Sequence, residues 1–315
     1  MKSVLATGAA ALCLASAPAS ALTLVADYSD PTVSSGIFIT DAGQLASSDL
    51  GGTATDVTDL FKSNVSAAFT YLQNSIQVPW TETVTIKLFD FQAAGIGADG
   101  DSSIDSTYIS DGRPASSTIR LDSSSASSFF IDPTPFDNSE YDMNFVDATL
   151  GGSTVNVGRY GSAVSGSAAE NRTDVLTLFL HELVHSTGFN FLDRFDDLAG
   201  PVGAADRKIT VPTSLTGFAF DFELPFLSES DHVDPFADGG LFEHAITAEP
   251  SFGANDRWLP TGAELYALCV VEGCTAGQVN PNLVAAAVPE PETYALLLAG
   301  LGLIGLVRRR QQSAQ

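Results

Sequence analysis

The chain has 315 residues and a formal net charge of −24, because 38 acidic residues stand against only 14 lysines and arginines. So large an excess of negative charge argues against nucleic acids and anionic membrane surfaces as partners. It is typical of a soluble domain in an extracellular setting, and the length suits one large domain.

The first 21 residues have the pattern of a secretory signal peptide. Lys2 is a short basic region, residues 4–17 form an apolar core, and small residues at 19–21 offer a cleavage site. We therefore expect export, with a mature chain that begins at Leu22.

Residues 22–276 are expected to form one domain that mixes helices and strands. Apolar residues recur at helical spacing from Asp56 to Ile76, which predicts a helix. Residues 83–91 alternate and are rich in β-branched and aromatic side chains, which predicts a strand. Residues 101–128 are rich in serine and aspartate, so we expect a long loop with a short strand at Thr118 to Leu121.

Three aspartates lie around the start of this predicted loop, at Asp99, Asp101 and Asp105. Clustered carboxylates are ligands that Ca²⁺ accepts, so the group could hold a calcium ion. A solvated loop without any ion is the alternative.

The most informative pattern is His-Glu-Leu-Val-His at residues 181–185. Histidines four residues apart fall on one face of a helix, so His181 and His185 can reach one metal ion. Glu182, between them, can take a proton from a water that the metal activates. The pattern therefore predicts a catalytic zinc site.

The flanking residues predict where this helix begins and ends. Residues 175–180 are almost all apolar, which favours a buried helix. Asn171 or Thr173 can cap its start. Gly188 follows where a helix would stop on a left-handed residue.

A catalytic zinc usually has three protein ligands and one open position, so a third ligand is needed. The chain has four histidines, and the two outside the motif are His232 and His244. Asp193, in the loop-rich region that we expect after Gly188, is a further candidate.

The run from His181 to Phe189 resembles the first part of the metzincin signature, HExxHxxGF. Phe191 occupies the position where most metzincins have their third histidine. In leishmanolysin-like metzincins that histidine follows a long insertion, within a Ser-His-Trp-like motif, and residues 230–234 (Ser-Asp-His-Val-Asp) resemble this arrangement. The resemblance implies His181, His185 and His232 as zinc ligands, with His244 and Asp193 as the alternatives.

The resemblance also places the methionine turn at residues 241–247. No methionine occurs there, so Ala245 or Ile246 would lie beneath the zinc. A competing zinc-peptidase clan would take a glutamate from a later helix, and Glu223 or Glu229 could be proposed for that role. The glycine after the second histidine favours the metzincin interpretation.

This resemblance implies an α+β zincin with a twisted, mostly parallel sheet, an active-site helix and a loop-rich C-terminal subdomain. It implies a secreted or surface zinc-dependent endopeptidase that acts on protein or peptide substrates, with Glu182 as general base. The substrate would lie extended along an edge strand of the sheet. The alternative is a non-catalytic extracellular surface or matrix protein that retains a structural zinc site.

Two local patterns mark the end of the domain. Residues 261–264 (Thr-Gly-Ala-Glu) have the form of a capping box, which predicts a helix through Leu268. Cys269 and Cys274 are spaced to form a local disulfide in an oxidising compartment, and zinc ligation by this pair is the alternative.

Residues 277–288 are expected to be a linker to a C-terminal targeting segment at 289–315. A Pro-Glu-Pro sequence at 289–291 is followed by an apolar stretch at 294–307 and three arginines. This order resembles the PEP-CTERM sorting signal of Gram-negative bacteria. It implies export across the inner membrane, membrane insertion through the apolar stretch, processing by an exosortase-type enzyme, and a final place at the cell surface or outside. An ordinary tail anchor is the alternative.

Overall fold

The computed structural model describes most of the predicted domain. The described residues are 22–29, 37–40, 45–47, 54–56, 58–123, 128–190, 192–248 and 253–282. The predicted signal peptide at 1–21 and the sorting segment at 289–315, with its apolar stretch, lie outside them. Among the helices of the described ranges, none is both long and apolar enough to cross a membrane.

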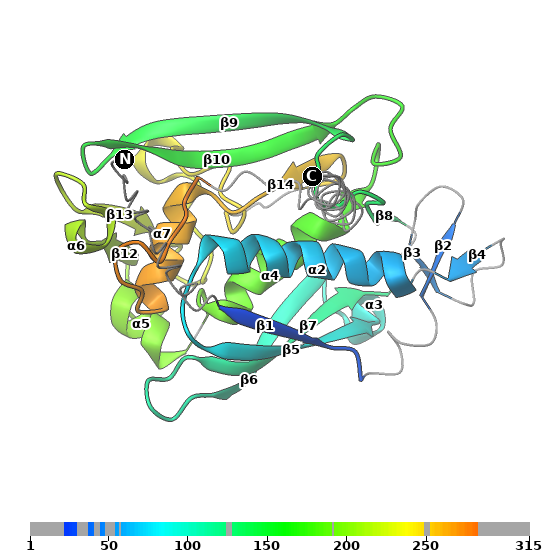
Figure 1. The fold of residues 1–315 in the computed structure, drawn as a ribbon, viewed down its shortest axis with the longest axis horizontal. Helices are drawn as coiled ribbons and strands as arrows, with labels where there is room; N and C mark the ends of the chain where they lie inside the picture. The colour runs from blue at the N-terminus through cyan, green and yellow to red at the C-terminus, as the bar shows by residue number, and fades with distance from the viewer. Residues whose placement is uncertain are drawn as a thin grey trace, which may run out of the picture.

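A four-stranded sheet forms the base of the mixed α/β structure (Figure 1). Its strand order is β1 (Thr23–Asp27), β5 (Thr81–Phe89), β7 (Pro114–Asp122) and β6 (Gly100–Thr107). The first three strands are parallel, and β6 pairs antiparallel with β7 at one edge. The sheet is therefore mostly parallel, as the family resemblance implies, and β5 lies at the strand predicted for residues 83–91.

The prediction of a long loop over residues 101–128 is wrong, because most of β6 and all of β7 lie there. The short strand predicted at Thr118 to Leu121 is part of β7. Most side chains of β6 are exposed or half-buried, so its sequence of serines and aspartates lacks the apolar alternation of an ordinary strand. Pairing with β7, which is mostly buried along one face, is what makes the segment a strand.

Two long helices cover one face of this sheet. The helix predicted for residues 56–76 is confirmed as α2 (Thr58–Ser75), which packs against β1. The helix that carries the His-Glu motif is α4 (Val175–Thr187), which packs against β6, β7 and α2. Figure 1 shows both helices running above the strands.

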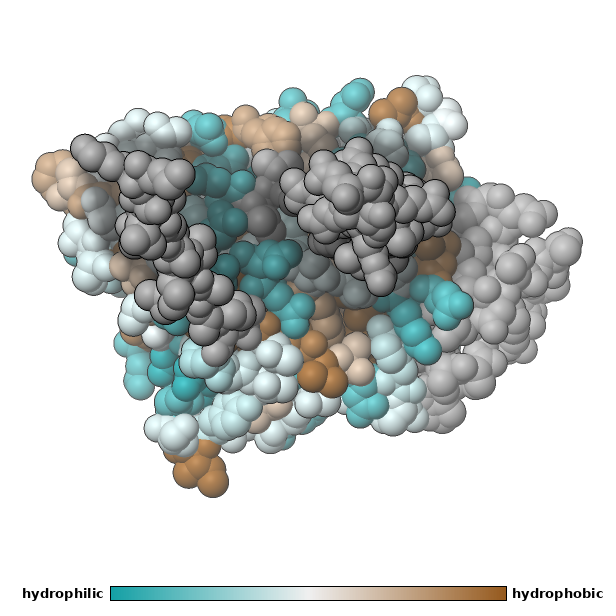
Figure 2. All heavy atoms as spheres, viewed as in Figure 1, coloured by the Kyte–Doolittle hydropathy of each residue, from teal (hydrophilic) through white to brown (hydrophobic). Residues whose placement is uncertain are grey.

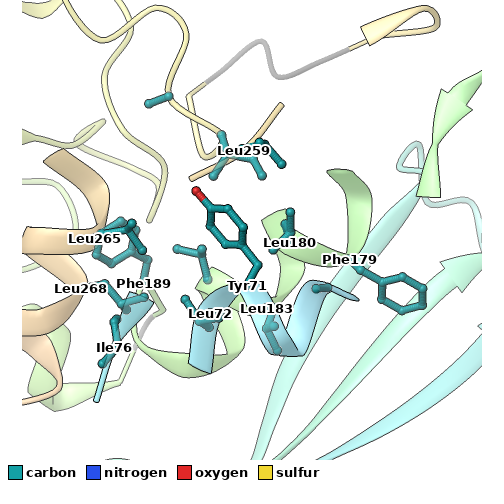
Figure 3. Packing of buried hydrophobic residues seen from close by; sticks show 14 of the residues in the cluster. Tyr71, Leu72, Ile76, Phe179, Leu180, Leu183, Phe189, Leu259, Leu265 and Leu268 are labelled. Atoms are coloured by element: carbon teal, nitrogen blue, oxygen red, sulfur yellow. The ribbon is translucent and has the colours of Figure 1, made fainter. Parts of the chain in front are cut away.

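The main core lies between α2, α4 and a C-terminal helix, α7 (Gly262–Val271). Figure 3 shows Leu72 of α2 near Leu183 of α4, with Leu268 of α7 on the other side of this cluster. The Tyr71 hydroxyl donates a hydrogen bond to the Pro260 carbonyl at 3.0 Å, so the end of α2 is also tied to the chain just before α7.

The remaining elements are short or lie at the periphery. One antiparallel sheet contains β3 (Leu45–Ser47), β2 (Ile37–Thr40) and β4 (Ala54–Asp56), and another contains β14 (Asp256–Trp258), β10 (Ser153–Ala163) and β9 (Tyr141–Leu150). Two-stranded pairs are β8 (Phe129–Phe130) with β11 (Thr173–Asp174) and β12 (Lys208–Val211) with β13 (Phe222–Pro225). The short helices are α3 (Phe91–Ala94), α5 (Asp193–Ala199), α6 (Thr213–Thr216) and η2 (Ala237–Gly239). The region after Gly188 is thus a series of short elements joined by turns.

The predicted start of α7 is confirmed. The Thr261 hydroxyl accepts from the backbone N–H of Glu264 at 3.1 Å, and the Glu264 carboxylate accepts from the N–H of Thr261 at 2.9 Å. The helix continues three residues beyond the predicted Leu268, to Val271. Cys269 and Cys274 form a disulfide that closes the loop after it.

After α7 the chain returns to the C-terminal end of α2. The N–H of Gln77 donates to the carbonyl of Gln278, and the N–H of Asn280 donates to the carbonyl of Ser75, both at 2.7 Å. The buried Arg159 guanidinium donates to the carbonyl of Pro281. The described part of the predicted linker, residues 277–282, therefore packs against the domain.

One face of the molecule is largely hydrophilic in its described part. Figure 2 shows hydrophilic residues spread over the described part of this face, with hydrophobic residues in small separate groups.

Candidate metal centre

The helix α4 is buried along its whole length and begins at a cap that the sequence analysis misplaced. The cap is Asp174, not Asn171 or Thr173, and its carboxylate accepts from the N–H of Thr177 at 3.1 Å. Thr173 and Asp174 pair with β8 as strand β11, so the chain stays extended up to Asp174 and the helix starts only at Val175.

Gly188 ends the helix, but not in the predicted left-handed conformation. Its φ is −172°, which is extended backbone open to any residue. A Cβ at this position would overlap the side chain of Leu268. Glycine is therefore needed for close packing between the end of α4 and α7.

Three histidines meet beside α4 and line one cleft. His181 and His185 come from α4, and His232 comes from the loop after β13. One ligand atom from each lies within 4.8 Å of the others, and this is the only such group of potential metal ligands among the described residues. The structure thus brings together the three residues that the resemblance selects.

The alternative third ligands lie elsewhere. The ring of His244 lies against the ring of Tyr160 with 3.8 Å between centroids and edge-on to Trp258. Asp193 is the first residue of α5 and does not line the cleft described below. Glu223 pairs with Lys208 at 2.9 Å on the β12–β13 hairpin.

Hydrogen bonds fix the tautomer of both helix histidines. The Nδ1 of His181 donates to the Ile246 carbonyl at 2.7 Å, and the Nδ1 of His185 donates to the Phe189 carbonyl at 2.6 Å. A carbonyl oxygen can only accept, so each neutral ring carries its proton on Nδ1 and presents a lone pair on Nε2.

The two Nε2 atoms are only 3.2 Å apart. Two lone pairs directed at each other at this distance repel, so a cation has to sit between the rings, either a proton or a metal ion. Two imidazole nitrogens on one tetrahedral zinc would be ~3.3 Å apart. The spacing of His181 and His185 therefore fits a zinc ion, and His232 lies close enough to offer a third ligand atom.

Asp231 is a residue of the centre that the sequence analysis did not select. Its carboxylate oxygens lie 3.4 Å from the Nδ1 of His185 and 3.3 Å from the Nδ1 of His232. Burial disfavours the charged form of His185, but the carboxylate of Asp231 outweighs this effect and raises the pKa of His185 to about 9. In return, although burial opposes its ionisation, the two histidines hold the pKa of Asp231 well below its usual range. Asp231 comes directly before His232 in the sequence, and this position beside a candidate ligand could have identified it.

Glu182 is 5 % exposed and faces the same centre. Burial raises the pKa of its carboxyl to about 7, against the opposing effects of His185 and of a hydrogen bond with the Ser102 side chain on β6. A pKa near neutrality suits a group that takes up a proton and later returns it.

These groups open into a cleft of about 660 Å³. One wall is the edge strand β6 with the residues before it, and the floor is α4. The lining residues include Ser102, Ile104, Leu178, Glu182, Asn190, Leu192 and the three histidines. The cleft therefore places the candidate metal centre beside a strand edge that has no sheet partner among the described residues.

The predicted calcium ligands do not converge. Asp101 forms an ion pair with Arg120 across the β6–β7 hairpin, and Asp105 accepts from the Thr118 hydroxyl at 2.8 Å. The carboxylates of Asp101 and Asp105 therefore stabilise the pairing of β6 with β7.

Comparison with known proteins identifies the C-terminal segment. Residues 287–311 match the PEP-CTERM protein-sorting motif, which confirms the resemblance seen in the sequence. The motif implies recognition by an exosortase-type processing enzyme, and it is consistent with export and surface sorting in Gram-negative bacteria. No curated protein matches the chain.

Proposed function

We propose that this protein is an exported zinc-dependent endopeptidase that holds its metal with His181, His185 and His232. The observation that carries the proposal is the pair of Nε2 atoms 3.2 Å apart, with a third imidazole beside them and Glu182 in the same cleft. A zinc site that serves only structure is usually closed by four protein ligands, whereas three ligands beside an open cleft favour catalysis.

We infer in addition that the domain is a metzincin-like zincin of the leishmanolysin-like type. Support comes from the mostly parallel sheet with an antiparallel edge strand, the distant position of His232, and the turn that lies against His181. The Ile246 carbonyl, which contacts His181, belongs to the segment 241–247 where the resemblance places the methionine turn.

Zinc, when bound, supplies a Lewis acid that polarises a carbonyl and lowers the pKa of a water molecule to about 7. Glu182 would accept the proton of the attacking water and pass it to the leaving amine of the cleaved peptide. Ser102, which contacts Glu182 from β6, would keep the carboxylate turned toward the cleft.

The substrate would bind as an extended peptide along β6. The outer edge of this strand offers backbone donors and acceptors, and a peptide can add to such an edge as a further strand. In this position its scissile bond would pass over His181 and Glu182, which line the same cleft.

The first prediction tests the roles proposed for Glu182 as general base and His232 as third zinc ligand. The Glu182→Gln variant should still bind one Zn²⁺ but should lose proteolysis of casein by about 10²- to 10⁴-fold, because the general base is gone. His232→Ala should lose both zinc and activity, whereas the matched control His244→Ala should keep both.

Chelation should abolish the activity of the unaltered protein, and Zn²⁺ should restore it. Zinc binding without any hydrolysis in the unaltered protein would favour the alternative, a surface protein with a structural zinc site. Retained activity in Glu182→Gln would refute the role given to Glu182.

A further inference from the structure

The carboxylate of Glu264 does more than cap α7. The residue is 1 % exposed and accepts four hydrogen bonds. One comes from the N–H of Thr261 at 2.9 Å, which completes the capping box. The other three come from the turn beneath His181: the N–H of Ile246 at 3.1 Å, the N–H of Thr247 at 2.9 Å and the Thr247 hydroxyl at 2.7 Å.

The peptide group between Ile246 and Thr247 links Glu264 to His181. Its N–H donates to Glu264, and its carbonyl accepts from the Nδ1 of His181 at 2.7 Å. The carboxylate, the peptide and the imidazole are therefore hydrogen-bonded in series. Each hydrogen bond in such a chain polarises the next, so the charge of Glu264 makes the Ile246 carbonyl a stronger acceptor.

We propose that Glu264 is a positioning residue for the metal centre, acting on His181 through this peptide group. It holds the Nδ1–H tautomer, fixes the orientation of the ring and makes the Nε2 atom a better donor to a metal. Carboxylates that contact metal-bound histidines directly have this effect, and here one peptide group is inserted between them. The inference rests on the proposed zinc centre.

The hydrogen bonds from Glu264 also explain how the turn at residues 241–247 keeps its position without a methionine. Ile246 and Thr247 are wholly buried, and their position is set by charged hydrogen bonds from α7. The carboxylate of Asp231 lies close to His185 and His232. With Glu264 acting on His181 through the peptide group, a carboxylate of this chain orients each of the three histidines.

The test compares Glu264→Gln with the matched control Thr261→Ala. Both variants weaken the capping box, but only the first removes the charge beneath the turn. In chelator competition, Glu264→Gln should bind Zn²⁺ about 10-fold more weakly, and its Co²⁺ form should show a shifted visible absorption spectrum. Thr261→Ala should have a lower Tm with unchanged Zn²⁺ affinity and Co²⁺ spectrum.

Equal Zn²⁺ affinity in Glu264→Gln and the unaltered protein would overturn the inference, and so would an equal loss in Thr261→Ala. Failure of the unaltered protein to bind Zn²⁺ would instead overturn the proposed function.

A second measurement needs no variant, in case Glu264→Gln does not fold. In NMR spectra of the unaltered protein, the amide proton of Thr247 should shift when Zn²⁺ is added. The amide proton of Gln77, which is hydrogen-bonded to the Gln278 carbonyl at the end of α2, should keep its chemical shift. An unmoved Thr247 resonance in a protein that binds Zn²⁺ would also overturn the inference.

Discussion

Each histidine of the centre is oriented by a group of this chain. The Nδ1 atoms of His181 and His185 bond to backbone carbonyls, and the Nδ1 of His232 lies 2.6 Å from the Ser230 hydroxyl. The rings are therefore already oriented without a metal, which would lower the free-energy cost of assembling the proposed zinc site. The carboxylate of Asp231 lies beside two of these rings, those of His185 and His232.

Replacing Asp231 with asparagine should weaken Zn²⁺ binding about 10-fold, the range found for groups that support metal ligands. The reason is that the negative charge beside His185 and His232 is lost while the shape of the side chain is kept. Chelator competition measures the change.

The control is Asp234→Asn in the same loop, where the carboxylate accepts from the N–H of Phe236 at 2.9 Å. Equal affinities of the two variants would show that Asp231 does not support the ligands.

At the scale of elements, the start of α4 is held by a buried charge cluster. Arg257 of β14 has no exposed side-chain surface and bonds to Asp174 at 2.9 Å and to Asp132 at 2.6 Å. Burial raises the pKa of Asp132 to about 6, although Arg257 opposes this shift. The cluster ties the helix cap to β14 and to the chain after β8.

The variant Asp174→Ala should lower the free energy of unfolding by about 3–5 kcal/mol, since removing one partner leaves a buried charge less compensated. Asp90→Ala, at the exposed cap of α3, should cost only about 1 kcal/mol. Urea unfolding followed by circular dichroism compares the two, and similar losses would contradict a special role for the cluster.

At the scale of the whole molecule, two buried carboxyls couple folding to pH. Burial raises the pKa of Glu82 to about 8, against a hydrogen bond from the Ser117 hydroxyl at 2.6 Å. Burial and the nearby Glu82 raise the pKa of Glu272 to about 8. Both groups are protonated in the folded protein at pH 7.

Because the folded state binds these protons more tightly than the unfolded state, the stability they contribute is complete below their ordinary pKa of 4.5 and is lost as pH rises through 8. Each group should change the free energy of unfolding by at most about 1.4 kcal/mol per pH unit in this window. Glu272→Gln should therefore flatten the dependence of stability on pH between 5 and 8.

The control Glu229→Gln, at an exposed position, should leave that dependence unchanged. A Glu272→Gln curve parallel to that of the unaltered protein would contradict the assignment.

Features determined by neighbouring residues were predictable from the sequence. The His-Glu motif, the capping box at Thr261 and the Cys269–Cys274 disulfide all involve residues at most five apart. His232 was selected by family resemblance, and the structure brings it to the other two histidines.

Features that depend on distant contacts were missed. Strand β6 exists because β7 pairs with it, and Asp174 becomes the cap because β8 and Arg257 hold it. Gly188 is required by Leu268, and the link between Glu264 and Thr247 joins two different elements. No local pattern contains this information.

The return of the chain to α2 after α7 determines where the domain bears mechanical load. Residues 283–288 separate the last described residue from the Pro-Glu-Pro sequence, a tether of at most about 25 Å when fully extended. A pull on the sorting segment reaches the domain at Pro281 and Asn280, and passes through Arg159 and Ser75 into α2. Because α2 packs against α4 in the core, the force is spread over the folded domain and is not taken up by α7 alone.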